Sequence, residues 1–324
     1  MKALICNEYD GPAALTVQET NRPVPEEGEV LIKVVAAGVS YVDVLMSRNK
    51  HQNKHETPFS PGMEVAGVIS ALGSSVSGFV IGDRVAALVY DGGQAEYVSA
   101  KISEVFKLPE GCDMVKTAAA LSVALTSEMA LTDKAGIAKG ETVLVGGAAG
   151  GIGLSAIQLA KYHGARVIAA VSSEARAETC RKAGADAALL YGADLRERVR
   201  AVNDGRDVDI VLDPVGGDFA EQAANILDWN GRYLVIGFAG GGVPKFAANR
   251  LLVKNRSVHG VVLGYYRWRK PEGLPVIAKT VLKAIAAGAL DMPLVELDGL
   301  AQVPDALSKI EKREMIGKAV VKIG

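Results

Sequence analysis

The sequence has few cysteines and no excess of charge of either sign. Cys6, Cys112 and Cys180 are widely separated and odd in number, which argues against a disulfide framework and favours a reducing cytosol. The 36 basic and 37 acidic residues leave a formal net charge of -1, so no global field attracts nucleic acid or an anionic membrane. We therefore expect neither as a partner.

Long hydrophobic runs are also missing. No stretch approaches the ~18 uninterrupted apolar residues expected of a membrane span. The N-terminal apolar run, residues 1–5, turns polar at Asn7 and Glu8, too early for a signal peptide. Hydrophobic residues make up 49% and charged residues 23% of the 324 residues, values that suit a globular protein with two domains. We expect a cytoplasmic enzyme or binding protein.

The first ~110 residues are typical of a β domain. Short β-branched segments at 30–35, 65–69 and 84–89 are separated by turn residues such as Gly28 and Gly82. This pattern predicts a compact, largely antiparallel β domain.

The pattern changes after Ala118 to strands that alternate with helices. Residues 142–145 predict a strand buried on both faces, and residues 152–160 have the apolar spacing of a helix. The alternation predicts a parallel, doubly wound sheet and therefore an α/β fold. The remaining predicted strands are 166–171, 208–212, 232–236, 258–263 and 318–323, and the remaining helices are 174–182, 195–203, 219–227 and 276–287.

A glycine-rich turn follows the strand at 142–145. Glycine permits positive φ and lets the backbone approach a ligand closely, and the helix that begins here points free N–H groups at an anion. A glycine turn alone also occurs for structural reasons, but its place between a strand and a helix favours dinucleotide binding. The residues we expect to hold the pyrophosphate are Gly147, Ala148, Gly150, Gly151, Ile152 and Gly153.

The end of the next strand distinguishes NAD from NADP. An NAD site usually has Asp or Glu there to bind the ribose 2′-hydroxyl. This strand ends instead with Ser172 and Ser173, and Arg176 follows closely. Two hydroxyls and a guanidinium suit a 2′-phosphate, so we expect NADPH. Glu174 is expected in the first turn of the next helix, and a solvated Arg176 is the alternative interpretation.

Six motifs in the same order resemble the zinc-free quinone oxidoreductase branch of the medium-chain dehydrogenase/reductase superfamily. They lie at 37–43, 58–67, 82–85, 92–97, 147–153 and 213–217. The resemblance covers essentially the whole chain. It implies a mainly β, GroES-like catalytic domain at 1–122 and 263–324, with a Rossmann dinucleotide-binding domain at 123–262. It also implies a homodimer that pairs near residues 258–263.

The resemblance also implies that the zinc site of related alcohol dehydrogenases is missing from this chain. Zinc alcohol dehydrogenases have Cys and His ligands in the segments that contain Ser40 and Met63 here, and the third ligand position falls near Val123. A serine hydroxyl, a thioether and a valine are poor zinc ligands, and Glu64 alone does not hold a catalytic zinc. We expect no metal, and acceptors that need no Lewis acid, namely quinones and conjugated enones or enoyl thioesters.

The resemblance also implies further site residues. Ser40, Thr126 and Tyr191 are expected beside the cofactor, with Tyr191 near the 2′-phosphate. The predicted contacts of the nicotinamide half are Val215, Phe238, Leu263 and Gly264. Phe238 and Leu263 are equally consistent with core positions. Asp213 is interpreted as the organiser of a turn.

Catalytic roles are predicted for Tyr41, Asp43 and His51, and the last is the boldest assignment. Some related enoyl reductases have a tyrosine proton donor where this chain has His51, and histidine donates a proton near neutral pH. The alternative is a solvated loop histidine among the polar residues 53–56. The aromatic residues Tyr265, Tyr266 and Trp268 either wall a flat substrate or belong to an interface or the core.

Two classes of function remain after these arguments. One is an NADPH-dependent reductase of quinones or activated alkenes. The other is a non-catalytic, NADPH-responsive binding protein on the same scaffold.

Overall fold

The computed structural model describes residues 1–323, which form two compact units. Unit 1 contains Met1–Ser122, Tyr266–Ala286 and the chain from Pro293 onward, and unit 2 contains Val123–Tyr265 and Ala287–Met292. Each unit is described separately below.

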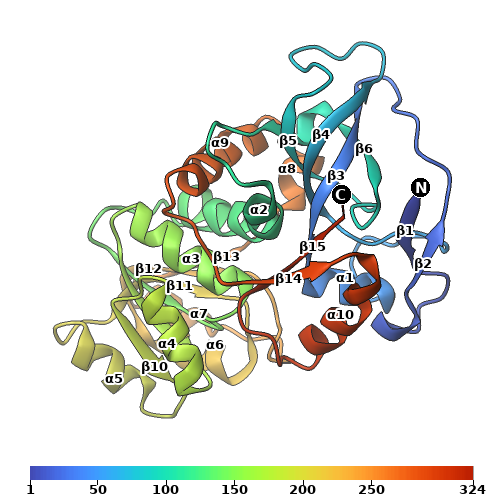
Figure 1. Ribbon diagram of the computed structural model, residues 1–324. Helices are drawn as coiled ribbons and strands as arrows, with labels where there is room; N and C mark the ends of the chain where they lie inside the picture. Colours follow the sequence, from blue (N-terminus) through green and yellow to red (C-terminus); the bar gives the residue numbers. More distant parts are fainter. Residues whose placement is uncertain (324) are drawn as a thin grey trace. The chain divides into compact units, whose positions relative to one another are not determined.

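Unit 2 is built on a six-stranded parallel sheet (Figure 1). The strand order is β10-β9-β8-β11-β12-β13, so the chain reverses its direction of travel across the sheet between β8 and β11, as in doubly wound folds. The predicted doubly wound sheet is confirmed. The strands are β8 (Thr142–Val145), β9 (Arg166–Val171), β10 (Ala187–Leu190), β11 (Val208–Asp213), β12 (Leu227–Val235) and β13 (Ser257–Gly260).

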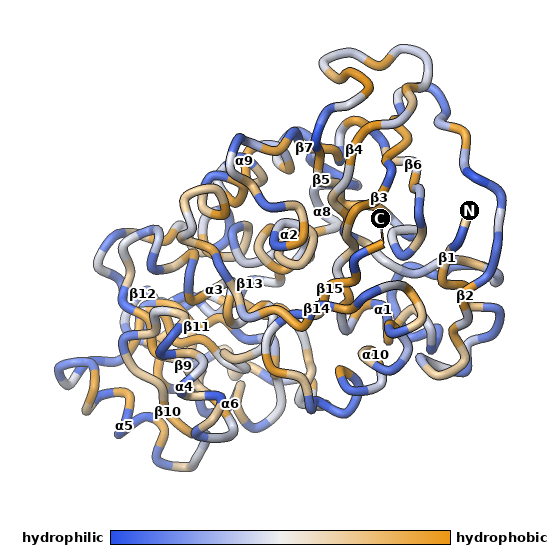
Figure 2. The backbone as a smooth tube through the Cα atoms, in the orientation of Figure 1, coloured by the Kyte–Doolittle hydropathy of each residue, from blue (hydrophilic) through white to orange (hydrophobic). Residues whose placement is uncertain are grey.

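Helices cover this sheet because its strands are apolar on both faces. Side chains alternate between the faces of a strand, and Leu144, Ile168 and Val211 pack in one cluster with residues of two helices, Leu195 and Phe219 among them. Figure 2 shows hydrophobic colour along β11 and β12, whereas α5 alternates hydrophilic and hydrophobic segments. The helices are α3 (Gly151–Tyr162), α4 (Glu174–Lys182), α5 (Leu195–Val202), α6 (Gly217–Ile226) and α7 (Ala248–Leu252).

Unit 1 is built on a mainly antiparallel sheet. Its strand order is β14-β15-β3-β4-β5-β7, and β6 also pairs with β3. Because β15 pairs with β3 from the N-terminal region, the C-terminal segment belongs to the same sheet as the first residues of the chain. The strands are β3 (Glu29–Val39), β4 (Glu64–Leu72), β5 (Arg84–Leu88), β6 (Tyr97–Lys101), β7 (Val105–Lys107), β14 (Leu294–Asp298) and β15 (Lys318–Lys322), with β1 (Lys2–Ile5) and β2 (Thr16–Glu19) as a separate ribbon.

Several helices lie outside the sequence prediction. They are α1 (Tyr41–Ser47), α2 (Met114–Met129), α8 (Gly264–Trp268) and α10 (Val303–Glu311), whereas α9 (Gly273–Ala286) was predicted. The strand predicted at 258–263 ends at Gly260, and α8 begins four residues later. Short turns of 3-10 or π helix occur at Pro12–Ala14, Ile102–Glu104, Ala130–Lys134 and Leu300–Gln302.

One helical stretch among residues 1–323, Met114–Lys134, is long and apolar enough by composition to cross a membrane. Its most apolar part is 67% buried inside the protein, and a buried core helix meets the same criterion.

Candidate active site

The glycine-rich turn joins β8 to α3 in unit 2. Gly147 has a positive φ of 55°, which favours glycine. A side chain on Gly153 would place its Cβ 2.5 Å from the carbonyl oxygen and 2.6 Å from the carbonyl carbon of Ala148, so α3 packs directly onto the turn. Gly150, the N-cap, provides no side-chain cap for the first N–H groups of the helix. The turn is therefore a backbone cradle that fits a pyrophosphate.

The cradle is fixed from two sides. The Ala148 N–H donates to the Ala170 carbonyl on β9 at 3.3 Å, and the Gly150 N–H donates to the Gly147 carbonyl at 2.9 Å. Gly151 and Ile152 form the first turn of α3. All six predicted residues of this turn thus lie in one short segment at the carboxyl end of β8, the edge where doubly wound sheets bind ligands.

The end of β9 has no carboxylate, as the sequence indicated. Ser172 is exposed, Ser173 is the N-cap of α4, and Arg176 lies half-buried in that helix. Glu174 is in the first turn of α4, as expected, and its carboxylate pairs with Arg181 at 2.6 Å. Ser172, Ser173 and Arg176 thus follow β9 at the place where an NAD site has its carboxylate.

Tyr191, predicted near the 2′-phosphate, contacts the glycine turn directly. Its phenolic oxygen accepts a hydrogen bond from the Gly147 N–H at 2.8 Å, and its ring lies 5.4 Å from that of Phe219. Burial raises the pKa of Tyr191, an effect that the Gly147 N–H and the charge of Arg176 oppose. Tyr191 therefore links the end of β10 to the turn after β8.

Asp213 organises the turn after β11, as predicted. Its buried carboxylate accepts the N–H groups of Val215 at 2.7 Å and Gly216 at 3.0 Å, and the Tyr233 hydroxyl at 2.5 Å. Burial raises its pKa, against the effect of these three donors. Because all its partners are internal, Asp213 acts on backbone geometry.

The predicted nicotinamide contacts lie on neighbouring turns of the same edge. A Cβ on Gly147 would meet Val215 Cγ2 at 3.0 Å, and one on Gly216 would meet the Phe238 ring at 3.2 Å. Phe238 is 46% exposed, which excludes the core interpretation for this residue. The half-buried Leu263 and Gly264 follow β13.

Thr126, the last predicted cofactor contact of unit 2, lies half-buried in the second half of α2.

In unit 1, Ser40 and Asp43 form a capping box at the start of α1. The Asp43 carboxylate accepts the Ser40 N–H at 2.7 Å and the Gly62 N–H at 3.1 Å. Asp43 is 1% exposed, and burial raises its pKa to about 6 although Lys318 and both N–H donors oppose the rise. These contacts suit a residue that positions Tyr41, which is 46% exposed at the first position of α1.

A buried ion pair lies next to this cap. Lys318 on β15 donates to the Glu64 carboxylate at 2.6 Å and to the Val39 carbonyl at 3.2 Å. Glu64 also accepts the Ser122 N–H at 2.7 Å. Its carboxylate is thus committed to internal donors. Within residues 1–323 no group of three or more His, Cys, Asp or Glu side chains could hold a metal ion.

His51 lies in the loop after α1 and is half-buried. Its Nδ1 lies 3.3 Å from the Asn53 carbonyl, and burial lowers its pKa, with further lowering by His55 and Lys54. The loop is less solvated than the alternative interpretation supposes. His55, grouped there with polar loop residues, is in fact buried, with its side chain only 3% exposed.

Sequence reasoning missed the partner of His55. Its Nδ1 lies 2.9 Å from the Asp91 carboxylate, and its ring lies 4.9 Å from Phe59 and 4.6 Å from Tyr90. Asp91 is 36 residues away, so no local spacing pattern could have indicated the pair.

The aromatic residues after Gly264 separate into two groups. Tyr266 is buried and packs against Gly273, so it is a core residue. Tyr265 and Trp268 are exposed by 36% and 49%, which leaves a ligand or interface role open to these two.

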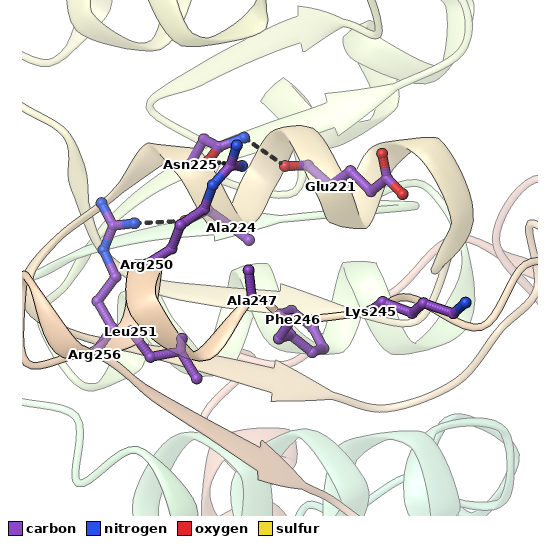
Figure 3. A pocket seen from close by; sticks show the side chains of 9 residues that line it. All are labelled: Glu221, Ala224, Asn225, Lys245, Phe246, Ala247, Arg250, Leu251 and Arg256. Atoms are coloured by element: carbon purple, nitrogen blue, oxygen red, sulfur yellow. Dashed lines mark hydrogen bonds between the residues drawn. The ribbon is translucent and has the colours of Figure 1, made fainter.

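A cavity of about 240 Å³ lies elsewhere in unit 2, beside α6 and α7 (Figure 3). Arg250 donates to the Asn225 side-chain oxygen, and Asn225 donates to the Glu221 carbonyl, both at 2.9 Å. None of the predicted cofactor residues lines it. The cavity residues are Glu221, Ala224, Asn225, Lys245, Phe246, Ala247, Arg250, Leu251 and Arg256.

Known proteins share both units of this chain. Residues 26–110 match the alcohol dehydrogenase GroES-like domain, and residues 151–279 match the zinc-binding dehydrogenase family. Quinone oxidoreductase-like protein 2 of Bos taurus is 34% identical over 99% of this chain and 92% of its own length. This chain belongs to the quinone oxidoreductase family of medium-chain dehydrogenases/reductases.

Solved structures of this family agree with the fold. A mycobacterial quinone oxidoreductase has a TM-score of 0.91 with 31% identity, and covers 99% of both chains. The Escherichia coli quinone oxidoreductase, solved as a complex with NADPH, has a TM-score of 0.90 with 26% identity, and covers 99% of this chain and 100% of its own.

Proposed function

We propose that this quinone oxidoreductase family member is an NADPH-dependent reductase that transfers a hydride to quinones or to conjugated C=C bonds without zinc. The observation that carries the proposal is the cradle of unit 2: a tight glycine turn against α3, followed by a strand end with Ser172, Ser173 and Arg176 in place of a carboxylate. The Escherichia coli relative, solved with NADPH, supports this cofactor.

The residues of unit 2 hold NADPH by its two charged parts. The N–H groups at the start of α3 bind the pyrophosphate, where the helix dipole adds to the attraction. Ser172, Ser173 and Arg176 bind the 2′-phosphate, and each charge-assisted hydrogen bond contributes about 1.5–3 kcal/mol. Tyr191 fixes the Gly147 backbone between these sites. The bound nicotinamide supplies the hydride.

Residues of unit 1 act on the acceptor. Reduction of a conjugated C=C bond needs a proton on the carbon next to the one that takes the hydride, and His51 is the proposed donor. A quinone needs no such donor, because the oxygens of its reduced product take protons from water. Tyr41, exposed at the start of α1, is proposed to contact the substrate, with Asp43 as the positioning residue beneath it.

The absence of zinc is proposed from the donor set. Ser40 is engaged by its helix cap, and Glu64 by Lys318 and the Ser122 N–H. With a thioether at Met63 and an aliphatic side chain at Val123, the four residues offer no thiolate or imidazole to Zn²⁺.

Turnover of NADPH with a panel of acceptors tests the proposed function. NADPH oxidation at 340 nm is followed with 1,4-benzoquinone, a linear enone and a simple aldehyde, in the presence and absence of a chelator. We expect sustained turnover with the first two and none with the aldehyde. Saturable NADPH binding without turnover of any acceptor would favour the alternative, a non-catalytic NADPH-responsive binding protein.

A further inference from the structure

The loop after α1 contains a buried histidine, His55, that is held by contacts on several sides. The His55 ring is buried between Phe59 and Tyr90, and the Tyr9 hydroxyl donates to its backbone carbonyl. Its Nδ1 lies 2.9 Å from the Asp91 carboxylate, while its buried Nε2 has no hydrogen-bond partner within the described residues. A buried ring nitrogen without a hydrogen-bond partner destabilises the fold, so its presence calls for a functional explanation.

Asp91 determines which ring nitrogen exchanges a proton. A carboxylate accepts but does not donate, so it keeps a proton on Nδ1 and leaves Nε2 as the atom that gains and loses one. The Asp91 side chain is 41% exposed, so the pair extends from solvent to the buried ring. The same orientation of an imidazole by a carboxylate serves proton transfer in hydrolase triads.

The proposed proton donor lies next to this pair. The His51 and His55 rings are stacked, with centroids 6.5 Å apart and planes 23° apart. A single water molecule spans about 5–6 Å between two nitrogen atoms that it contacts. One bridging water molecule between the two rings is therefore part of the proposal that follows.

We propose that His55, oriented by Asp91, is a proton relay that reprotonates His51 during reduction of conjugated C=C bonds. This inference depends on the proposed function, because it assigns the source of the proton that His51 delivers. His55 is a positioning and relay residue, and no contact with substrate is assigned to it.

The proton balance is simple. The N–H bond at His55 Nε2 breaks and an N–H bond forms on His51, through one water molecule that accepts one proton and gives up another. The positive charge moves from His55 to His51, and His51 then gives the proton to the carbon next to the hydride acceptor. His55 is left neutral, with its Nδ1–H still donated to Asp91, and its buried Nε2 takes the next proton back through the same bridging water molecule.

The relay explains how His51 can act as an acid although its pKa is lowered. Burial lowers the pKa of His51, and Lys54 and His55 lower it further, so the ring is mostly neutral at neutral pH and must be recharged in each cycle. The charged and titratable groups around the histidine pair are Lys54 in the same loop, Tyr9 near the N-terminus, Tyr90 and Asp91 after β5, and Arg267, whose guanidinium lies over the Tyr90 ring.

The first test is spectroscopic and needs no turnover. The chain has four histidines, His51, His55, His163 and His259, so single variants assign every imidazole signal. In ¹H–¹⁵N spectra we expect His55 as the Nδ1–H tautomer, and as the commoner Nε2–H tautomer in Asp91→Ala. In His55→Phe, the titration midpoint of His51 should move to higher pH because a neighbouring positive charge is removed. An unchanged tautomer and an unchanged His51 midpoint would overturn the inference.

The second test compares two acceptors in the same variants. At pH 8, His55→Phe and Asp91→Asn should lower enone reduction about tenfold or more, within the range of a positioned acid. Reduction of 1,4-benzoquinone and the Kd for NADPH should stay within about twofold. The loss should shrink at pH 5.5, where His51 takes protons directly from solvent. The phenyl ring keeps the stack with Phe59 and Tyr90, and Asp91→Asn leaves the buried ring in place if His55→Phe does not fold.

A matched control comes from the other histidine–carboxylate pair. His163 Nε2 lies 2.9 Å from Glu128 in unit 2, and His163→Phe should change neither the enone-to-quinone ratio nor the His51 titration. Equal losses for both acceptors in His55→Phe, or no loss for either, would refute the relay. If the wild type reduces no enone, the proposed function fails on that substrate, whereas the tautomer and titration measurements still decide whether His55 and Asp91 control the protonation of His51.

Discussion

Gly153 provides the sharpest test of the cofactor cradle, because its replacement by alanine adds one methyl group where the structure has no room. The new Cβ would lie 2.5 Å from the Ala148 carbonyl oxygen and 2.6 Å from its carbonyl carbon. Non-bonded heavy atoms normally approach to about 3.5 Å. Both atoms are backbone, so no rotamer change relieves the overlap, and the start of α3 must move away from the turn by about 1 Å.

The size of the effect follows from this displacement. Overpacking of this kind costs about 1–3 kcal/mol, which in a domain of this size lowers the Tm by about 2–12 °C. The displaced helix also loses alignment with the pyrophosphate. Loss of one charge-assisted hydrogen bond, about 1.5–3 kcal/mol, corresponds to about a tenfold to a hundredfold increase in the Kd for NADPH.

Calorimetric titration with NADPH and thermal unfolding of the apoprotein measure the two effects in Gly153→Ala. The matched control is Gly260→Ala on β13, where an added Cβ meets no atom within 4 Å. It should bind NADPH as the wild type does. Wild-type affinity and wild-type Tm in Gly153→Ala would refute the interpretation of this glycine as the contact that seats α3 on the turn.

Four further outcomes are expected. Arg176→Ala should remove a preference for NADPH over NADH of at least about tenfold, measured as the ratio of the two Kd values. Lys318→Met should destabilise the fold by about 3–5 kcal/mol in urea unfolding, because it leaves the Glu64 carboxylate buried without its counter-ion. The double variant Lys318→Met, Glu64→Gln should regain part of this stability. Enone reduction by the wild type should fall as pH rises through a midpoint below about 6.5, since the reaction needs protonated His51 and burial lowers its pKa; a rate that rises over this range would contradict its role as an acid. Elemental analysis after dialysis should find no stoichiometric zinc, and chelators should leave activity unchanged.

The sequence predicts the elements of unit 2 well because their signals are local. The strand at 142–145, the strand at 166–171 and the helix at 174–182 lie where hydrophobic periodicity and glycine turns placed them. The four-residue strand β10 was not predicted, because Ala187–Leu190 is only half-buried and lacks a run of β-branched residues. Helix α2 was also missed, since it is apolar on most sides and shows little helical periodicity.

The polar pairs of unit 1 were beyond the reach of sequence reasoning. Lys318 and Glu64 are 254 residues apart and meet only because β15 closes the N-terminal sheet. His55 and Asp91 come from two loops, and the residue types alone suggested solvated side chains. Burial changes the meaning of such residues, because a charge in water costs nothing to leave unpaired whereas a buried one requires a partner.

This contrast bears on why the cofactor is easier to determine than the substrate. Binding of a dinucleotide depends on backbone N–H groups and on two side-chain types after one strand, so a short contiguous sequence contains most of the information. In the proposed function, the choice between a quinone and a conjugated alkene depends on proton supply. His51 is the proposed donor, and His55 recharges it at pH values where solvent does not protonate it directly. Of the two steps, the one from His51 to His55 is local, with ring centroids 6.5 Å apart in one loop, whereas the His55–Asp91 contact of 2.9 Å is tertiary. We therefore expect a chain with the same glycine turn but without this pair to keep its cofactor and its quinone reduction, and to lose most of its reduction of conjugated C=C bonds.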